Sequence, residues 1–126
     1  MGFGSVLPNV MKDFTEILYC YRAIVTRVID GDTLVVDIDL GLGVWKKDER
    51  IRLLGLNTPE LRDAGGVAAK EYVESKMLAQ PVFIQTRKDK KGKYGRYLGV
   101  IYFYHGAQVI NLNDLLVEKG YAEVRK

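Results

Sequence analysis

The sequence is short of the residues that build disulfide frameworks and zinc sites. Among its 126 residues there is one cysteine, Cys20, and one histidine, His105. A single cysteine excludes an internal disulfide and gives no zinc-ligand spacing, so we interpret Cys20 as a small buried apolar residue. His105 lies in a predicted hairpin turn, where we expect no chemical role for it. A hydrophobic core must therefore stabilise the fold, and the length suits a single domain with such a core.

Long apolar runs are also missing. No segment approaches the ~18 consecutive apolar residues that a membrane-spanning helix requires. Residues 1–19 do not resemble a signal peptide, because they lack a basic start and because Lys12, Asp13 and Glu16 interrupt the apolar positions. We therefore expect no membrane association, and a cytoplasmic location is favoured.

Positive charge is concentrated in one short segment. Residues 87–96 contain six basic residues and one acidic residue, whereas the rest of the chain contains 13 basic and 15 acidic residues. Such a cluster is typical of a surface that binds a polyanion. The alternative is a solvated loop in which the lysines only maintain solubility.

Periodicity divides the chain into strands and helices. Residues 1–18 form an N-terminal segment that is either a short helix or partly ordered, and residues 19–126 form the domain. Residues 41–50 are predicted to be an extended hairpin loop. In the helix predicted at 66–80, Val67, Ala68, Tyr72, Val73 and Met77 form the apolar face. Strands are predicted at 19–29, 34–39, 50–56, 82–87 and 97–104, and a second helix at 114–119 with Asn113 as its N-cap.

The order of these elements predicts an α+β fold that is mainly β. Three strands precede the first helix, two strands follow it, and the second helix comes after the fifth strand. This order is that of a five-stranded barrel of the OB-fold type, with one helix between strands 3 and 4 and a second helix after strand 5. Oligonucleotide binding is frequent among such barrels, but the fold alone does not establish a function.

Several charged residues lie where a barrel does not need them. Asp32 lies in the turn formed by residues 30–33, where it is either a solvated turn residue or a hard oxygen ligand for a divalent cation. Arg52 lies between Ile51 and Leu53, so its side chain points away from theirs. On an exposed binding face its planar guanidinium would fit a phosphate with two parallel hydrogen bonds.

Polar residues also follow the third strand and the basic segment. Asn57 and the carbonyl of Thr58 are neutral oxygen donors, and the carboxylate of Glu60 follows them; the alternative is a plain connection between a strand and a helix. Lys93 and Tyr94 precede Arg96 in the basic segment. Tyr94 would stack on a base, unless it is only a half-buried aromatic residue of the loop.

Together these residues are the components that phosphodiester cleavage requires. A cation neutralises the phosphate, arginines stabilise the charge that develops on its oxygens, and a carboxylate positions or deprotonates a water molecule. Asp32, Asn57 and Thr58 are the candidate metal ligands. Arg52, Glu60 and Arg96 are the candidate catalytic residues, and Lys93 and Tyr94 are the candidate substrate-binding residues.

The chain resembles the staphylococcal-nuclease-like domain of the thermonucleases and micrococcal nucleases. The motifs VIDGDT at 28–33, RLLGLNTPE at 52–60, KYGR at 93–96 and NxxLxxxGYA at 113–122 occur in the order of that family. The resemblance extends from about Tyr21 to Val124. It implies a calcium-dependent nuclease that cleaves DNA and RNA with little sequence preference.

The resemblance also implies a role for each candidate residue. Asp32, Asn57 and the Thr58 carbonyl would hold calcium, and Arg52 and Arg96 would hold the scissile phosphate. Glu60 would be the general base, and Tyr94 would contact a nucleotide. We expect single-stranded DNA or RNA to be the preferred partner of a monomer or weak homo-oligomer.

Two departures from the family pattern affect these expectations. Asn57 stands where the well-known member has a calcium-binding aspartate, so we expect weaker calcium binding. Base-stacking tyrosines of that member have no counterpart before Lys126, so nucleotide affinity is expected to be lower or to depend on a partner subunit. The alternatives to a nuclease are a nucleic-acid-binding OB-fold module with little or no catalytic activity, and a protein-interaction barrel.

Overall fold

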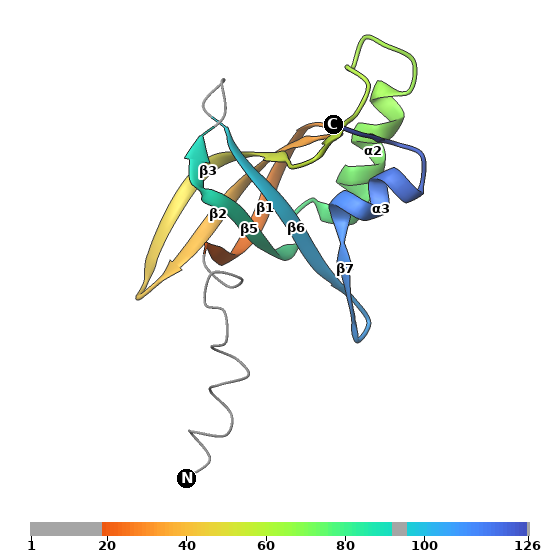
Figure 1. Cartoon of the computed structure of the whole chain (residues 1–126). Helices are drawn as coiled ribbons and strands as arrows, with labels where there is room; N and C mark the ends of the chain where they lie inside the picture. The colour runs from red at the N-terminus through yellow and green to blue at the C-terminus, as the bar shows by residue number, and fades with distance from the viewer. Residues whose placement is uncertain (1–18, 92–95, 126) are drawn as a thin grey trace.

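A closed five-stranded β-barrel forms the centre of the molecule (Figure 1). The computed structural model describes residues 19–91 and 96–125. The five barrel strands pair in the order β3-β2-β1-β5-β6, and a parallel pairing of β3 with β6 closes the ring. Their bounds are β1 Cys20–Asp30, β2 Thr33–Gly41, β3 Val44–Leu53, β5 Pro81–Lys91 and β6 Tyr97–His105. The predicted fold class, a mainly β protein with a five-stranded barrel of the OB-fold type, is confirmed.

Alternating apolar residues fill the barrel. Leu34, Val36 and Ile38 of β2 point into the core, as the period-2 pattern of that segment predicts. Ile51 and Leu53 of β3 do the same and are fully buried. On both strands the residues that alternate with these buried ones face outward, and they include the polar side chains of the candidate site.

Two helices lie on the same side of the barrel, as Figure 1 shows. Helix α2, Gly66–Met77, follows the two-residue strand β4, Leu56–Asn57, and ends three residues before the predicted end. Its buried face is Gly66, Ala69, Val73 and Met77. The prediction that Val67 and Ala68 belong to this face was wrong, because the helical turn directs both of them to solvent. None of the helices within 19–91 and 96–125 is long and apolar enough to cross a membrane.

The second helix begins earlier than predicted and has a different cap. Strand β7, Gln108–Asn111, was not predicted; it extends β6 as a hairpin and leads directly into α3, Leu112–Glu118. The Asn111 side chain accepts a hydrogen bond from the Asp114 N–H at 3.0 Å and is the N-cap, whereas the predicted cap, Asn113, is buried. Strand β8, Glu123–Val124, then pairs with β4.

The predicted loop at 41–50 is instead a long hairpin. β2 and β3 continue to a two-residue turn, and both Leu42 and Gly43 have positive φ, which is the geometry of a type I′ turn. The prediction failed because most side chains of 44–50 face solvent, so no apolar alternation marks the strand. Cys20 also differs from its predicted burial, because it is exposed at the start of β1. The N-terminal segment 1–18 lies outside the described residues.

Candidate functional site

The turn between β1 and β2 places Asp32 beneath the end of β3. The Asp32 main-chain N–H donates to Oδ1 of Asp30 at 3.1 Å, which holds the turn closed. The Asp32 carbonyl accepts a hydrogen bond from the Leu53 N–H at 2.8 Å. Asp32 is buried, so its carboxylate needs partners that compensate for lost hydration.

Arg52 of β3 is the charged partner of Asp32. The register pairs Thr33 with Arg52, so the guanidinium lies over the turn that contains Asp32. Nη2 of Arg52 donates to Oδ2 of Asp32 at 3.2 Å and also to Oδ1 of Asn57. Only 13% of the Arg52 side chain and 10% of the Asp32 side chain are exposed. The sequence places Arg52 on the face opposite the core. Its side chain does not extend into solvent but binds the polar side chains of Asp32 and Asn57.

Thr58 completes this cluster of Asp32, Arg52, Asn57 and Thr58, which we call the Asp32 cluster. The Thr58 N–H donates to Oδ2 of Asp32 at 3.2 Å, while the Thr33 hydroxyl donates to Oδ1 at 3.2 Å. The Thr58 hydroxyl oxygen is buried and has no hydrogen-bond partner in the structure. Buried hydroxyls rarely lack a partner, so this oxygen has unused hydrogen-bonding capacity within the cluster.

Gly31 allows Thr58 to approach the turn. A Cβ atom on Gly31 would lie 2.9 Å from both Cγ2 and Oγ1 of Thr58, and 2.8 Å from Cβ of Ala69 on α2. A larger residue would therefore push both the Thr58 segment and the helix away from Asp32. The glycine between the two aspartates is a packing requirement of the cluster.

The two aspartates of the turn titrate differently. Burial, together with the hydrogen bond and charge of Asp32, raises the pKa of Asp30 to about 6. Burial also acts to raise the pKa of Asp32, but hydrogen bonds from Asp30, Thr58 and Thr33 and the charge of Arg52 lower that pKa below its ordinary value. Asp32 is thus the carboxylate of the pair that stays ionised, which is the form that binds a cation.

Glu60 lies near the Asp32 cluster in sequence, but its carboxylate points elsewhere. Its Oε2 pairs with Nε of Arg62 at 3.0 Å, and these side chains are 68% and 82% exposed. An ion pair this exposed contributes little to stability and does not hold Glu60 in place. The main chain of Glu60 is held more firmly, because its carbonyl accepts the Asp63 N–H at 2.9 Å.

Arg96 immediately precedes β6, the strand that pairs with β3. Because Ile51 pairs with Tyr97 in the parallel ladder, the backbone of Arg96 adjoins that of Arg50. Arg96 is half-buried. The structure therefore puts Arg96 directly before a strand that pairs with the one that carries Arg52. The other two candidate residues of this segment, Lys93 and Tyr94, lie outside the described residues.

The Asp32 cluster offers oxygen donors that suit a hard divalent cation. Oδ2 of Asp32 and Oδ1 of Asn57 both contact one cationic nitrogen of Arg52, so the two oxygens lie close enough to share a positive charge. The unpartnered Thr58 hydroxyl adds a third oxygen nearby. Within 19–91 and 96–125, no three His, Cys, Asp or Glu side chains gather as a metal-binding group. A cation would thus depend on one carboxylate and neutral oxygens, a set typical of weak calcium sites.

Sequence reasoning missed the glycines that shape this region. Gly31 was treated only as part of a turn, and Gly66 only as the start of a helix. A Cβ atom on Gly66 would lie 2.6 Å from the carbonyl carbon of Glu60 and closer still to its oxygen, so the start of α2 packs directly on the Glu60 backbone. The adjacent pair Gly65 and Gly66 was the available signal for such a close approach.

Comparison with known proteins agrees with the motifs. The family model described as staphylococcal nuclease homologue matches residues 50–126. An uncharacterized protein of Methanocaldococcus jannaschii is 33% identical over 140 residues, covering 92% of this chain and 65% of that protein. The thermonuclease of Staphylococcus intermedius is 33% identical over 108 residues, covering 81% of this chain and 58% of the thermonuclease. The micrococcal nuclease of Shigella flexneri is 32% identical over 107 residues, covering 81% and 57%.

The matches cover most of this chain but only part of each relative. The chain spans 57% to 65% of the length of these relatives. The family match includes Arg52, Asn57, Glu60 and Arg96, and it begins after Asp32. It covers more than half of the chain, including the β3–β6 closure of the barrel. The chain therefore belongs to the staphylococcal nuclease homologue family.

Proposed function

We propose that this protein is a calcium-dependent nuclease that hydrolyses phosphodiester bonds of DNA and RNA with little sequence preference. The observation that carries the proposal is the Asp32 cluster, in which Arg52 contacts both Asp32 and Asn57. Membership of a nuclease family supports the same conclusion. Single-stranded nucleic acid is the proposed substrate, because its phosphates and bases are accessible to a shallow barrel surface.

Each candidate residue has a defined task in this reaction. Arg52 and Arg96 bind the scissile phosphate and stabilise the charge that develops on its oxygens. The Glu60 carboxylate accepts a proton from the attacking water, whose oxygen forms a bond to phosphorus. The phosphorus–oxygen bond to the leaving nucleotide breaks at the same time, and the leaving oxygen takes a proton from solvent. In the structure the exposed Glu60 carboxylate pairs weakly with Arg62, so it must leave this pair and turn toward the Asp32 cluster to perform this task. Lys93 and Tyr94 are proposed to contact the neighbouring nucleotide.

Asp32, Asn57 and the Thr58 carbonyl are the proposed calcium ligands. When bound, calcium would neutralise charge on the phosphate and orient it for attack. In the structure Arg52 contacts oxygens of both Asp32 and Asn57, so the guanidinium and the cation compete for them. Asn57 contributes no charge, and we therefore expect weak binding, which Asn57→Asp should strengthen. Calcium titration of both proteins by calorimetry checks this, and equal affinities would exclude Asn57 as a ligand.

One assay tests the proposed activity. Labelled single-stranded DNA is incubated with the protein and calcium, and in parallel with chelator. We expect cleavage only with calcium, and Glu60→Gln should reduce the rate about 10²-fold or more. Glu71→Gln is the matched control, because it removes an exposed carboxylate from α2. Cleavage that persists in chelator would contradict the metal requirement.

The second candidate is a nucleic-acid-binding module without catalysis. The outward position of Glu60 and its pairing with Arg62 favour it, since a general base normally lies within reach of its water. Salt-sensitive binding of single-stranded DNA without any cleavage would support this module. If the protein neither binds nor cleaves nucleic acid, the remaining alternative is a barrel that binds other proteins.

A further inference from the structure

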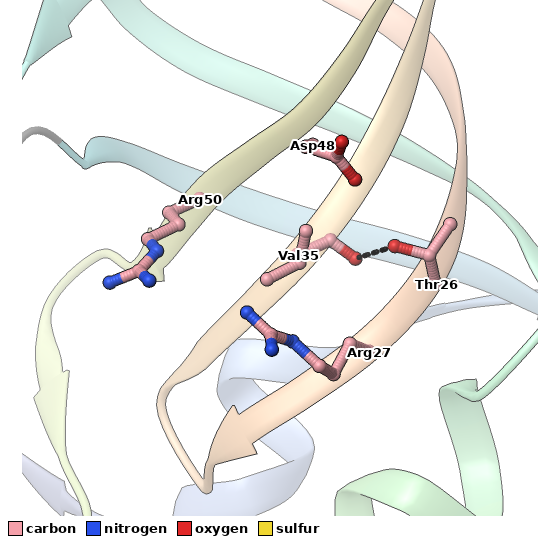
Figure 2. Close-up of a pocket in the computed structure, with 5 residues that line it drawn as sticks. All are labelled: Thr26, Arg27, Val35, Asp48 and Arg50. Carbon is pink, nitrogen blue, oxygen red and sulfur yellow. Dashed lines mark hydrogen bonds between the residues drawn. The ribbon is translucent and has the colours of Figure 1, made fainter.

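A second group of arginines lies on the outer face of the barrel, outside the Asp32 cluster. Thr26 and Arg27 of β1, Val35 of β2, and Asp48 and Arg50 of β3 line a hollow of about 480 Å³. We call it the outer hollow. Figure 2 shows its residues extending from three adjacent strands. None of the proposed catalytic or metal-binding residues lines it.

The strand register brings the two arginines of the outer hollow together. Arg27 pairs with Val35, and Val35 pairs with Arg50, so the three residues form one row across β1, β2 and β3. Two strand spacings separate the arginine backbones, or about 9.5 Å. Figure 2 shows both guanidinium groups on the same side of the sheet as the Val35 side chain. Long arginine side chains can therefore approach a common ligand across Val35.

Val35 is the apolar residue between the two arginines of the outer hollow. It points away from the core, because its neighbours Leu34 and Val36 point into it. It is nevertheless only 4% exposed. Apolar stems of arginine cover such surfaces while their charged heads stay in water. The Val35 side chain thus offers an apolar surface to the arginine stems, and packing on it would reduce the entropy that they lose when they bind a ligand.

Neither arginine of the outer hollow is neutralised by an acid. Within the described residues, none of the ion pairs within 4.0 Å involves Arg27 or Arg50. The hollow does contain Asp48, and Figure 2 shows its carboxylate across Val35 from the guanidinium groups. The Asp48 N–H is held by Oδ1 of Asp37 at 3.0 Å, toward the hairpin end of β3. The arginine end of the hollow thus carries two unpaired positive charges on one face, and an anion would relieve their repulsion.

The outer hollow adjoins the Asp32 cluster along β3, because Arg50 lines the hollow and Arg52 belongs to the cluster. Arg50 and Arg52 are two residues apart on one strand, on either side of the inward-facing Ile51, so they share the outer face. Their backbones are about 6.7 Å apart. This spacing is comparable to that of successive phosphates on an extended nucleic-acid strand. A strand whose scissile phosphate contacts Arg52 would thus bring an adjacent phosphate to Arg50.

We propose that Arg27 and Arg50 form a phosphate-binding subsite of the outer hollow, which holds the backbone of a nucleic-acid substrate next to the scissile phosphate. This subsite rests on the proposed function of the Asp32 cluster and extends it to a longer substrate. It is sequence-independent, because it binds only backbone phosphate. It predicts that the protein prefers oligonucleotides to substrates with a single phosphate.

The test compares two substrates in the double variant Arg27→Gln/Arg50→Gln. The first is a ten-nucleotide single strand, and the second is a nucleoside nitrophenyl phosphodiester, which has only one phosphate. We expect KM for the oligonucleotide to rise about 10-fold, as the loss of one or two charge-assisted contacts implies, with kcat little changed. KM for the single-phosphate substrate should change less than about twofold, since that substrate does not reach the subsite. Arg22→Gln is the matched control, because it removes an exposed arginine near the other end of β1.

Binding without cleavage separates this subsite from the proposed catalysis. Affinity for the same strand is measured by fluorescence anisotropy in chelator at several salt concentrations. The double variant should lower the slope of log affinity against log salt by about 1 relative to wild type and Arg22→Gln. If the wild type binds this strand but never cleaves it, the catalytic proposal fails and a reduced slope still supports the subsite. If the wild type cleaves and the double variant keeps both its KM and its salt slope, the subsite is overturned.

Discussion

The start of helix α2 at Gly66 packs directly on the main-chain carbonyl of Glu60, with no room for a side chain. A Cβ atom on Gly66 would also lie 2.9 Å from Cα of Leu61. The contact couples the position of α2 to the loop that carries the proposed general base. Gly65 makes the entry possible, because its φ of 86° is in the left-handed region that favours glycine.

Gly66→Ala should therefore disturb both stability and activity. The added methyl group must displace the backbone of 60–61 or the start of α2, and such overpacking costs about 1–3 kcal/mol. Urea unfolding measures the loss, and kcat measures the displacement of Glu60. Gly41→Ala is the control: it has positive φ and open space, so it should reduce stability and leave kcat unchanged. Wild-type stability and kcat in Gly66→Ala would contradict the close contact.

The buried pair of Asp32 and Arg52 should show strong energetic coupling. A double-mutant cycle with Asp32→Asn and Arg52→Gln, measured by urea unfolding in chelator, is expected to give about 1–3 kcal/mol. The exposed pair of Glu60 and Arg62, changed to Gln at both positions, is the matched control and should give below about 1 kcal/mol. Equal coupling in the two pairs would contradict the shielding of Asp32 from solvent.

Asp30 should make the protein less stable as pH rises. Its pKa is raised to about 6, so its folded form binds a proton more tightly than the unfolded chain does. The resulting stabilisation is complete below about pH 4 and is lost as pH rises through about 6. Asp30→Asn stays neutral, so its melting temperature relative to wild type should increase between pH 4 and pH 8 in chelator.

The titration of Asp30 can also be observed directly. Its carboxyl carbon followed by NMR in chelator should titrate near pH 6. Glu71→Gln corrects the melting experiment for the change of one charge, because it removes an exposed carboxylate of α2. If the difference between wild type and Asp30→Asn does not vary with pH, the Asp30 carboxyl is not perturbed by its neighbours.

The Asn113 side chain should contribute more to the free energy of unfolding than Asn111, the other asparagine at α3. Its Oδ1 accepts the Ile101 N–H at 3.2 Å, and its Nδ2 donates to the carbonyls of Leu54 at 3.0 Å and Gly99 at 3.2 Å. Asn113→Asp keeps the shape but directs a carboxylate oxygen at two carbonyls. We expect a loss of at least about 2–3 kcal/mol at pH 8 by urea unfolding, partly recovered at low pH where the acid can donate.

Asn111→Ala is the matched control for that variant. It removes the N-cap of the same helix, which typically costs about 1 kcal/mol, with no dependence on the pH of the measurement. A similar and pH-independent loss in both variants would show that the Asn113 side chain is not enclosed by the carbonyls of Leu54 and Gly99.

Local patterns in the sequence predict burial better than they predict pairing. The alternation at Leu34, Val36 and Ile38 identifies a strand and its inner face, and the position of Arg52 between Ile51 and Leu53 places it on the outer face. The same information cannot say that Arg52 binds Asp32, because the contact joins positions 20 residues apart across a strand register. The hydrophobic periodicity also does not predict the direction of the Glu60 side chain, which is exposed and pairs only weakly with Arg62.

Errors in the predicted elements have a common cause. The hairpin at 41–50 lies largely in solvent on both faces, so neither face has an apolar pattern. At α3 two asparagines two residues apart have equal propensity for a cap, and only burial of Asn113 against β6 distinguishes them. In both places tertiary contact, and not local propensity, decides the structure.

The parallel pairing of β3 with β6 links the folding of the barrel to the assembly of the proposed phosphate site. It brings Ile51 beside Tyr97, and the residues that adjoin this pairing, Arg52 and Arg96, are the two proposed to hold one phosphate. Pairings between such distant segments form slowly, because a long loop must be closed before they are made. A chain that has not yet paired β6 with β3 holds Arg52 and Arg96 apart, so the proposed phosphate site is completed only when the barrel closes.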